Sequence, residues 1–415
     1  MLPTRVADVR GRSIPRMASD DGPGSGSGDQ PASDPFANLP MFGDLAKALA
    51  GQGPLNWDAA RQFASLSSSG GTSERNVDPA IRMAYEQLIP IADMHVRDTT
   101  GLATASAALE LVTPGVWAQR TLEAYRPLFT ELAVSLGRSG PTTADDQPDD
   151  GDPMMAMMAG LSQMMAPSMM GMAIGSMVGR LAGRAFGQYD LPIPRTATSL
   201  LIVPSSVDAF AADWSLPLDE MRLWVLAQEL IGHAVFSHAI VRETITSLVQ
   251  RHVGAFRPDA SSISEKLTSL DLDGADPMQI LQRAFSDPEI LLGAVRSAEQ
   301  IEQAPVLDAA TAAVVGYVDY MVDAVAARLI GGDALGIAEA VRRRRIEATA
   351  EDVFIERLLG LQVSAAQVRR GKDFIAGVVD RSGEGDLTRL FDTAGGLPTP
   401  AEIDAPGLWL ARIQL

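Results

Sequence analysis

The hydrophobic positions along this chain recur mainly at the spacing of a helix. Apolar residues fall three or four positions apart through most of the sequence, and polar or Pro- and Gly-rich stretches separate the apolar runs. This pattern predicts a mainly α protein, with one large helical domain and little sheet. The helices that we expect lie at 38–66 (two short helices), 78–97, 101–112, 117–136, 154–187, 215–238, 239–255, 276–284, 288–303, 306–331, 351–361 and 364–381.

Polar stretches mark the limits of this domain. Residues 1–37 are rich in Gly, Ser, Asp and Pro, which cannot form a hydrophobic core, so we expect a disordered tail. The helical domain then runs over 38–415, interrupted by an acidic loop at 137–153. The short apolar run at 200–203 is typical of a single strand, and Asn56 is a candidate N-cap.

Residues 154–179 are unusual in composition. They contain no charged residue and more than half of the chain's 18 methionines, and glycines follow at four-residue spacing. Such glycines leave a smooth stripe that lets another backbone approach closely. The segment is long enough to cross a membrane, but Ser, Gln and Pro interrupt it. We therefore favour a buried helix and keep a membrane contact or a membrane span as alternatives. The stripe consists of Gly171, Gly175, Gly179, Gly183 and Gly187.

The charge and the cysteine content exclude some classes of function for this protein. The formal net charge is −18, which argues against broad nucleic-acid binding because that function requires basic surface. The chain has no cysteine, which excludes disulfides and thiol catalysis and is compatible with the cytoplasm. Residues 1–16 lack the apolar run of a secretory signal, and translation from Met1 and from Met17 are equal alternatives. We expect a cytoplasmic protein.

The helix expected to begin at Ser215 carries part of a zinc-protease motif. In the pattern His-Glu-x-x-His, two histidines four residues apart bind one Zn²⁺ and the glutamate acts as the general base. This chain has Gln228, Glu229 and Gly232 at those positions. The catalytic-type glutamate is present, whereas an amide and a glycine replace the two imidazoles. No zinc or other cofactor is therefore expected.

Two other interpretations of this helix stay open. Glu229 and His233 are also four residues apart, so they form an alternative ligand pair, although no separate general base is then left. A buried helix without chemistry is equally compatible with its almost continuous apolar surface.

The histidines and the basic cluster give weaker signals. His233, His238 and His252 lie within twenty residues, but their spacing does not place them on one helix face, so we expect surface or capping histidines. The four arginines Arg342–Arg345 are expected to form a solvated face.

Several segments together resemble the zincin-like metallopeptidases and hydrolases that are widespread in actinobacteria. The resemblance covers nearly everything after residue 35, and it implies a helical zincin-like fold. It also implies that a glutamate directly before the sequence Gly316-Tyr317-Val318-Asp319 is the third zinc ligand, and here that position is Val315. The segments are PFANLPMFGDL (35–45), GPLNWDAARQFA (53–64), GQYDLPIP (187–194), VPSSVDAFAADWSLPLDEMRLWV (203–225), VGYVDYMVDA (315–324) and RLLGLQV, RGKDFIAGVVDRSG and LPTPAEI further on.

All three implied ligand positions thus hold weak or non-ligating residues: Gln228, Gly232 and Val315. We expect a degenerate family member that acts as a binding or scaffold protein without zinc, with a protein or peptide partner and no nucleic acid. The alternative is an active zinc-dependent hydrolase with an atypical site around Glu229 and His233. The oligomeric state, the partner and the substrate do not follow from the residues.

Overall fold

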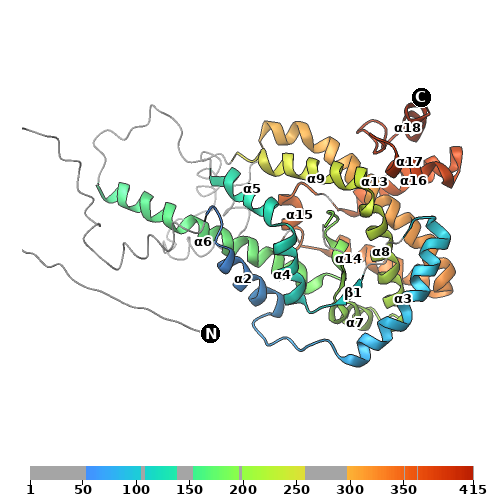
Figure 1. Ribbon diagram of the computed structural model, residues 1–415, viewed down its shortest axis with the longest axis horizontal. Coiled ribbons are helices and arrows are strands. Elements are labelled where there is room, and N and C mark those ends of the chain that lie inside the picture. The colour runs from blue at the N-terminus through green and yellow to red at the C-terminus, as the bar shows by residue number, and fades with distance from the viewer. Residues whose placement is uncertain are drawn as a thin grey trace, which may run out of the picture. The chain divides into compact units, whose positions relative to one another are not determined.

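Helices that the hydrophobic pattern predicts make up most of the computed structural model (Figure 1). It describes residues 53–103, 108–137, 153–195, 199–257, 297–349, 351–361 and 363–414, with the side chains of 153–163 left aside. The predicted tail, the helix before residue 53, the acidic loop after Gly137 and the helix at 276–284 lie outside these residues. The elements are α2 (Trp57–Ser69), α3 (Pro79–Thr100), β1 (Ala108–Leu111), α4 (Pro114–Ala124), α5 (Arg126–Gly137), α6 (Pro153–Arg184), η1 (Gln188–Asp190), β2 (Ser199–Ile202), α7 (Pro204–Asp213), α8 (Leu218–Ser237), α9 (Ala239–Gly254), α13 (Ala298–Leu329), η2 (Gly331–Asp333), α14 (Ala334–Glu347), α15 (Phe354–Leu358), α16 (Ala365–Ser382), η3 (Glu384–Thr388), α17 (Arg389–Asp392) and α18 (Pro406–Ile413).

The mainly α prediction is confirmed, and the described residues contain one small sheet. β1 pairs with β2 in parallel, with Leu109 opposite Leu200. The strand expected from the apolar run at 200–203 is therefore present. The helix expected over 101–112 is wrong, because its second half forms β1. Local sequence favours a helix there, but pairing with a strand about ninety residues away decides the conformation.

Prolines account for two further differences. The helix expected over 117–136 is divided at Tyr125, and Pro127 is the second residue of the new helix α5, a position that tolerates proline. In contrast, α13 continues through Pro305, where we expected a break between two helices. Gln300 before the proline and Leu307 after it are both buried, so the helix is packed on either side of Pro305.

The two expected helix caps have different outcomes. The Asn56 side chain accepts the backbone N–H groups of Asp58 and Ala59, so the predicted N-cap is confirmed. Ser215 does not begin a helix. It has a positive φ of 52° in a turn, and α8 begins at Leu218 after Pro217.

Three glycines of α6 pack against the backbone of α2. A Cβ atom added at Gly171, Gly175 or Gly179 would lie 2.2–2.5 Å from a main-chain oxygen of α2 or of its N-cap residue. Because real Cβ atoms do not approach so closely, only glycine allows this helix contact. A Cβ at Gly183 would lie 3.7 Å from the nearest oxygen, so the close contact ends before it. In Figure 1, α2 lies alongside α6.

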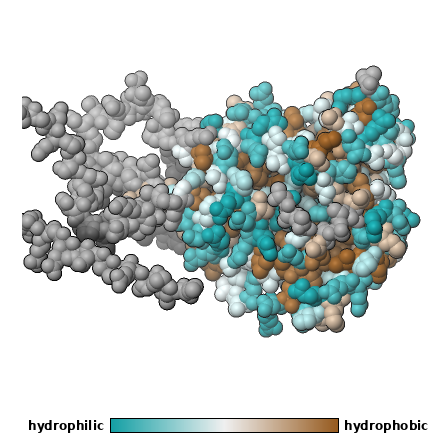
Figure 2. Space-filling model, in the orientation of Figure 1, coloured by the Kyte–Doolittle hydropathy of each residue, from teal (hydrophilic) through white to brown (hydrophobic). Residues whose placement is uncertain are grey.

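A second close contact positions the helix that borders the site. Gly316 of α13 and Gly371 of α16 lie against each other, and a Cβ at Gly371 would overlap the main-chain oxygen of Ala312. α13 is therefore packed tightly on α16. Among the described helices, α13 is long and apolar enough to cross a membrane, yet 72% of its apolar window is buried inside the protein; α8 and α9 pass the same test only as a pair bent by 89°. Hydrophilic residues cover much of the face shown in Figure 2.

The α2–α6 contact predicts opposite effects at two neighbouring glycines. Gly179→Ala should lower the free energy of unfolding by about 1–3 kcal/mol, because the new methyl group overpacks the contact. Gly183→Ala should be neutral or stabilising, since alanine favours the helix and meets only ordinary contacts. Thermal and urea unfolding of both variants measure this, and equal effects would contradict the packing described.

Candidate functional site

A pocket lies where α8, α13 and α14 meet, beside the segment that follows α6. Gln228, Gly232 and Phe236 are spaced four residues apart on α8, so they line the same face of the pocket. Val315 lines it from α13, which packs against α8. The pocket has a volume of about 80 Å³. This is roughly half of the ~150 Å³ cavity known to bind benzene, so the pocket suits a small group.

The structure thus brings together Gln228, Gly232 and Val315, three positions that are far apart or on different helix turns in sequence. Gln228 and Val315 are half-buried although most of their neighbours are fully buried, as expected of residues that border a pocket. The convergence arises because one helix supplies two of the positions and a second, fixed by its glycine contact with α16, supplies the third.

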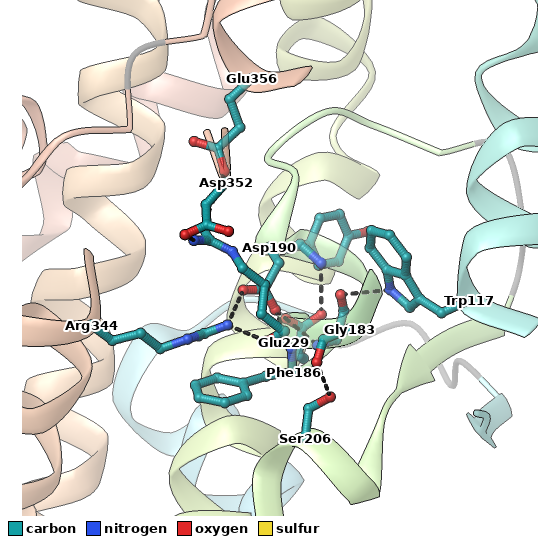
Figure 3. Close-up of polar contacts among 12 residues, drawn as sticks. Trp117, Gly183, Phe186, Asp190, Ser206, Glu229, Arg344, Asp352 and Glu356 are labelled. Carbon is teal, nitrogen blue, oxygen red and sulfur yellow. Dashed lines mark hydrogen bonds and ion pairs between the residues drawn. The ribbon is translucent and has the colours of Figure 1, made fainter. Parts of the chain in front are cut away.

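Glu229 does not line this pocket. Its side chain is fully buried, and Oε2 accepts the backbone N–H of Tyr189 at 2.9 Å. A Cβ at Gly187 would lie 2.4 Å from the Glu229 carboxyl carbon, so the backbone there rests directly on the carboxyl group. The segment around Gly187 and Tyr189 therefore separates Glu229 from solvent. Figure 3 shows Glu229 beside Asp190 and Phe186.

The Tyr189 ring lies over Gly232, the position at which the zinc-protease motif has its second histidine. A Cβ added at Gly232 would be 3.0 Å from a carbon of the Tyr189 ring. The ring also stacks on Phe236 with a centroid separation of 5.1 Å, and its hydroxyl lies 3.0 Å from Nδ1 of His233. His233 is thus engaged with a tyrosine, and burial lowers its pKa, so the neutral form is favoured.

Charged residues complete the wall of the pocket. Arg344 packs its guanidinium over the Phe186 ring at 3.7 Å and lies 3.5 Å from Asp190. Arg345 pairs with Asp319 at 3.4 Å. Burial alone would raise the pKa of Asp319, but Arg345 and Lys372 lower it, so Asp319 is ionised. Within the described ranges, no group of three His, Asp or Glu side chains has the arrangement of a metal site.

Comparison with known proteins places the chain in a family. The model of the zincin-like metallopeptidases matches residues 55–410. The chain belongs to the zincin-like metallopeptidase family. None of the curated proteins matches it. A solved structure from Chloroflexus aurantiacus, described as a "putative hydrolase with a novel fold", is similar with a TM-score of 0.56 and 21% identity, covering 87% of this chain and 99% of that one. At this identity the similarity shows the fold.

The residues present do not fit the zinc that a zincin family implies. A catalytic zinc site needs three protein ligands from His, Asp, Glu or Cys and an open fourth position. At the positions that converge here, Gln228 supplies an amide, and Gly232 and Val315 supply no ligand atom. Tyr189 also fills part of the space next to Gly232.

Of the expectations about neighbouring residues, those for two histidines and for the arginine cluster are corrected by the structure. His233 and His252 are buried, not surface residues, because they pack inside helix contacts. His238 does lie at a helix end, at the junction of α8 and α9. Of the cluster Arg342–Arg345, only Arg343 has a largely exposed side chain; the other three reach acidic partners, so the solvated-face prediction is wrong for them.

Several residues of the site gave no recognisable signal in the sequence. Asp190 accepts the backbone N–H groups of Phe186 and Gly187, which fixes the end of α6, and Glu356 lines the pocket from α15. An Asp shortly after a helix is common at chain turns, so its spacing alone does not identify it. Glu356 lies more than a hundred residues after Asp190 in the sequence, so no local pattern links the two.

The environment of Glu229 changes its protonation. Burial raises the pKa of the Glu229 carboxyl from 4.5 to about 8, and the negative charge of Asp190 adds to the increase, while the Tyr189 N–H and Arg195 oppose it. Near pH 7 the group is mostly protonated. A protonated, enclosed carboxyl cannot accept a proton from a water in the pocket, so the geometry does not support a general-base role.

This pKa predicts a pH-dependent stability. Between pH 4.5 and about 8 the folded protein keeps a proton that the unfolded chain releases, so stability falls with rising pH across this window. The slope from this group is at most about 1.4 kcal/mol per pH unit. Glu229→Gln keeps the shape and cannot ionise. It should match the parent near pH 5 and exceed it by a few kcal/mol near pH 8, as measured by urea unfolding.

The control for this comparison is Glu86→Gln, which removes an exposed carboxylate on α3. Its unfolding curve should follow that of the parent at both pH values. If Glu229→Gln also follows the parent, the carboxyl group is not enclosed as described.

Proposed function

We propose that this protein is a degenerate member of the zincin-like family that acts as a non-catalytic binding or scaffold protein without zinc. One observation carries the proposal: Gln228, Gly232 and Val315 line one pocket. A pocket with a weakly ligating amide and two side chains without ligand atoms at these positions suits binding without zinc chemistry. We further propose a cytoplasmic location and a protein or peptide partner.

The condition of Glu229 supports the same conclusion. In an active site the glutamate of the motif must face the metal-bound water and accept its proton. Here the Gly187–Tyr189 segment covers the carboxyl group, and burial keeps it protonated near neutral pH. Restoring the ligands alone would therefore leave the proton acceptor out of reach.

The alternative is an active hydrolase that uses Glu229 and His233 as ligands. Both are on α8, but Tyr189 contacts each of them: its N–H bonds to Glu229 and its hydroxyl lies next to His233. A metal between the two side chains would have to displace Tyr189. The zinc measurement below separates this alternative from the proposal.

We expect the purified protein to contain far less than one zinc per chain and to show no chelator-sensitive peptidase activity. Elemental analysis of protein expressed in zinc-supplemented medium, with a peptidase assay before and after chelation, measures both. About one zinc per chain, lost together with activity on chelation, would replace the proposal by the hydrolase alternative.

The triple variant Gln228→His, Gly232→His and Val315→Glu tests whether the pocket is the former zinc site. Two imidazoles four residues apart and a carboxylate from α13 would supply three ligands with an open fourth position. Zinc should then raise the melting temperature of the triple variant through its affinity for the folded state. Peptidase activity is not expected, because Glu229 stays enclosed.

Each single variant and the parent serve as controls for this titration. Gly232→His matters most, since its Cβ lies close to the Tyr189 ring and the substitution alone should lower stability. Equal zinc responses in all five proteins would mean that the three positions do not converge as ligands.

A further inference from the structure

Three guanidinium groups line the pocket: Arg184 at the end of α6 and Arg344 and Arg345 on α14. Three carboxyl groups, those of Asp190, Asp319 and Glu356, line the same pocket, so what matters is how far each guanidinium is occupied by them. Two other arginines on α6 and α14 lie outside the pocket. Arg180 and Arg343 have more exposed side chains and pair with Glu351 and Glu339 at the surface.

The Arg184 guanidinium has hydrogen-bonding capacity left over. Its buried Nε has no hydrogen-bond partner among the residues that the structure describes. Its terminal nitrogens lie 3.7 Å from Glu356 and 3.8 Å from Asp352, beyond ordinary hydrogen-bond distance. Burial raises the pKa of Glu356 to about 7, although Arg184 opposes the shift, so this partner is partly neutral near pH 7.

The ion pairs of the other two arginines with pocket carboxylates are also long, although Arg344 has a close main-chain partner as well. Arg344 donates to the main-chain oxygen of Arg184 and lies 3.5 Å from Asp190, and burial lowers the pKa of its guanidinium. The contact between Arg345 and Asp319 is 3.4 Å, and Asp319 is shared with Lys372 at 3.1 Å. Planar N–H donors of this kind bind a carboxylate through paired hydrogen bonds.

Branched aliphatic side chains form another part of the lining. Val315, Val318 and Val322 follow at helical spacing on α13, and Val341 and Val353 lie on the same pocket. Val315 and Val318 are only half-buried, so their methyl groups have apolar surface left to cover. Burying such surface against an aliphatic group is favourable.

We propose that this pocket binds a carboxylate that carries a short branched aliphatic group, with Arg184 and Arg345 holding the carboxylate and the valines of α13 covering the aliphatic part. The proposal rests on the zinc-free binding role proposed above. Inorganic phosphate would use the arginines and leave the valines uncovered. The volume of about 80 Å³ limits the bound group to a few carbon atoms. A free small acid and the C-terminal residue of a peptide both have this chemistry.

The test uses the full chain, freed of metal and then gel-filtered, because common chelators are themselves carboxylates. Isobutyrate, acetate, isobutyramide, inorganic phosphate and a tetrapeptide ending in valine with a free carboxylate are titrated by ligand-observed NMR and calorimetry. Isobutyrate should bind about tenfold more tightly than acetate, which lacks two methyl groups. It should also bind at least tenfold more tightly than isobutyramide, which has the same shape without the charge. The peptide binds if the natural source is a C-terminus and does not if it is a free acid.

Variants locate the binding in the pocket. Arg184→Gln and Arg345→Gln should each weaken isobutyrate binding at least tenfold, whereas the matched changes Arg180→Gln and Arg343→Gln should leave it unchanged. Val318→Thr keeps the side-chain shape and should weaken isobutyrate without affecting acetate. Melting temperatures without ligand show whether the arginine variants fold. If they do not fold, Val318→Thr provides the test.

Four outcomes would overturn the proposal: no isobutyrate binding, equal binding of isobutyramide, equal binding of phosphate, or equal losses in the pocket variants and their matched controls. The zinc content before metal removal, with isobutyrate titrations before and after it, keeps the two proposals apart. If the protein contains no zinc and does not bind isobutyrate, only the proposed ligand class is wrong. Stoichiometric zinc whose removal abolishes isobutyrate binding overturns the zinc-free function.

Discussion

The site depends on how the segment after α6 is held against α8. The Asp190 carboxylate accepts the N–H of Gly187, the Trp117 indole donates to the Gly187 oxygen at 2.8 Å, and the Tyr189 N–H donates to Glu229. These bonds join three parts of the chain at one point. Because Gly187 has no side chain, its backbone can rest on the Glu229 carboxyl group, and Tyr189 then takes its place over α8.

That arrangement sets the chemistry on both sides of the segment. On the inner side, Glu229 is enclosed and burial raises its pKa to about 8, so the carboxyl group is mostly protonated near pH 7. On the outer side, the pocket between α8 and α13 is lined by guanidinium, carboxyl and aliphatic groups. Guanidinium groups suit an anion, as histidine and glutamate suit a metal ion, which is the basis of the carboxylate-binding role proposed above.

Part of the fold and of the site could be predicted from the sequence, and the wrong predictions have physical causes. The convergence of Gln228 and Gly232 follows from four-residue spacing on one helix, and the place of Val315 came from the family resemblance. The helix expected over 101–112 and the break expected at Pro305 were wrong, because strand pairing and packing overruled local preference. His233 was misplaced at the surface because a lone histidine in an apolar helix does not reveal what it faces.

The sequence by itself determined the mainly α class, the glycines that admit close helix contacts, and the residue types at the three implied ligand positions. These properties are local, since helical periodicity decides which residues share a face. Only the tertiary structure decided that Glu229 turns away from the pocket and is protonated, and that Arg184, Arg344 and Arg345 meet there. Burial and charge pairing depend on neighbours from distant parts of the chain, such as the Arg184 and Glu356 side chains, which no local pattern specifies.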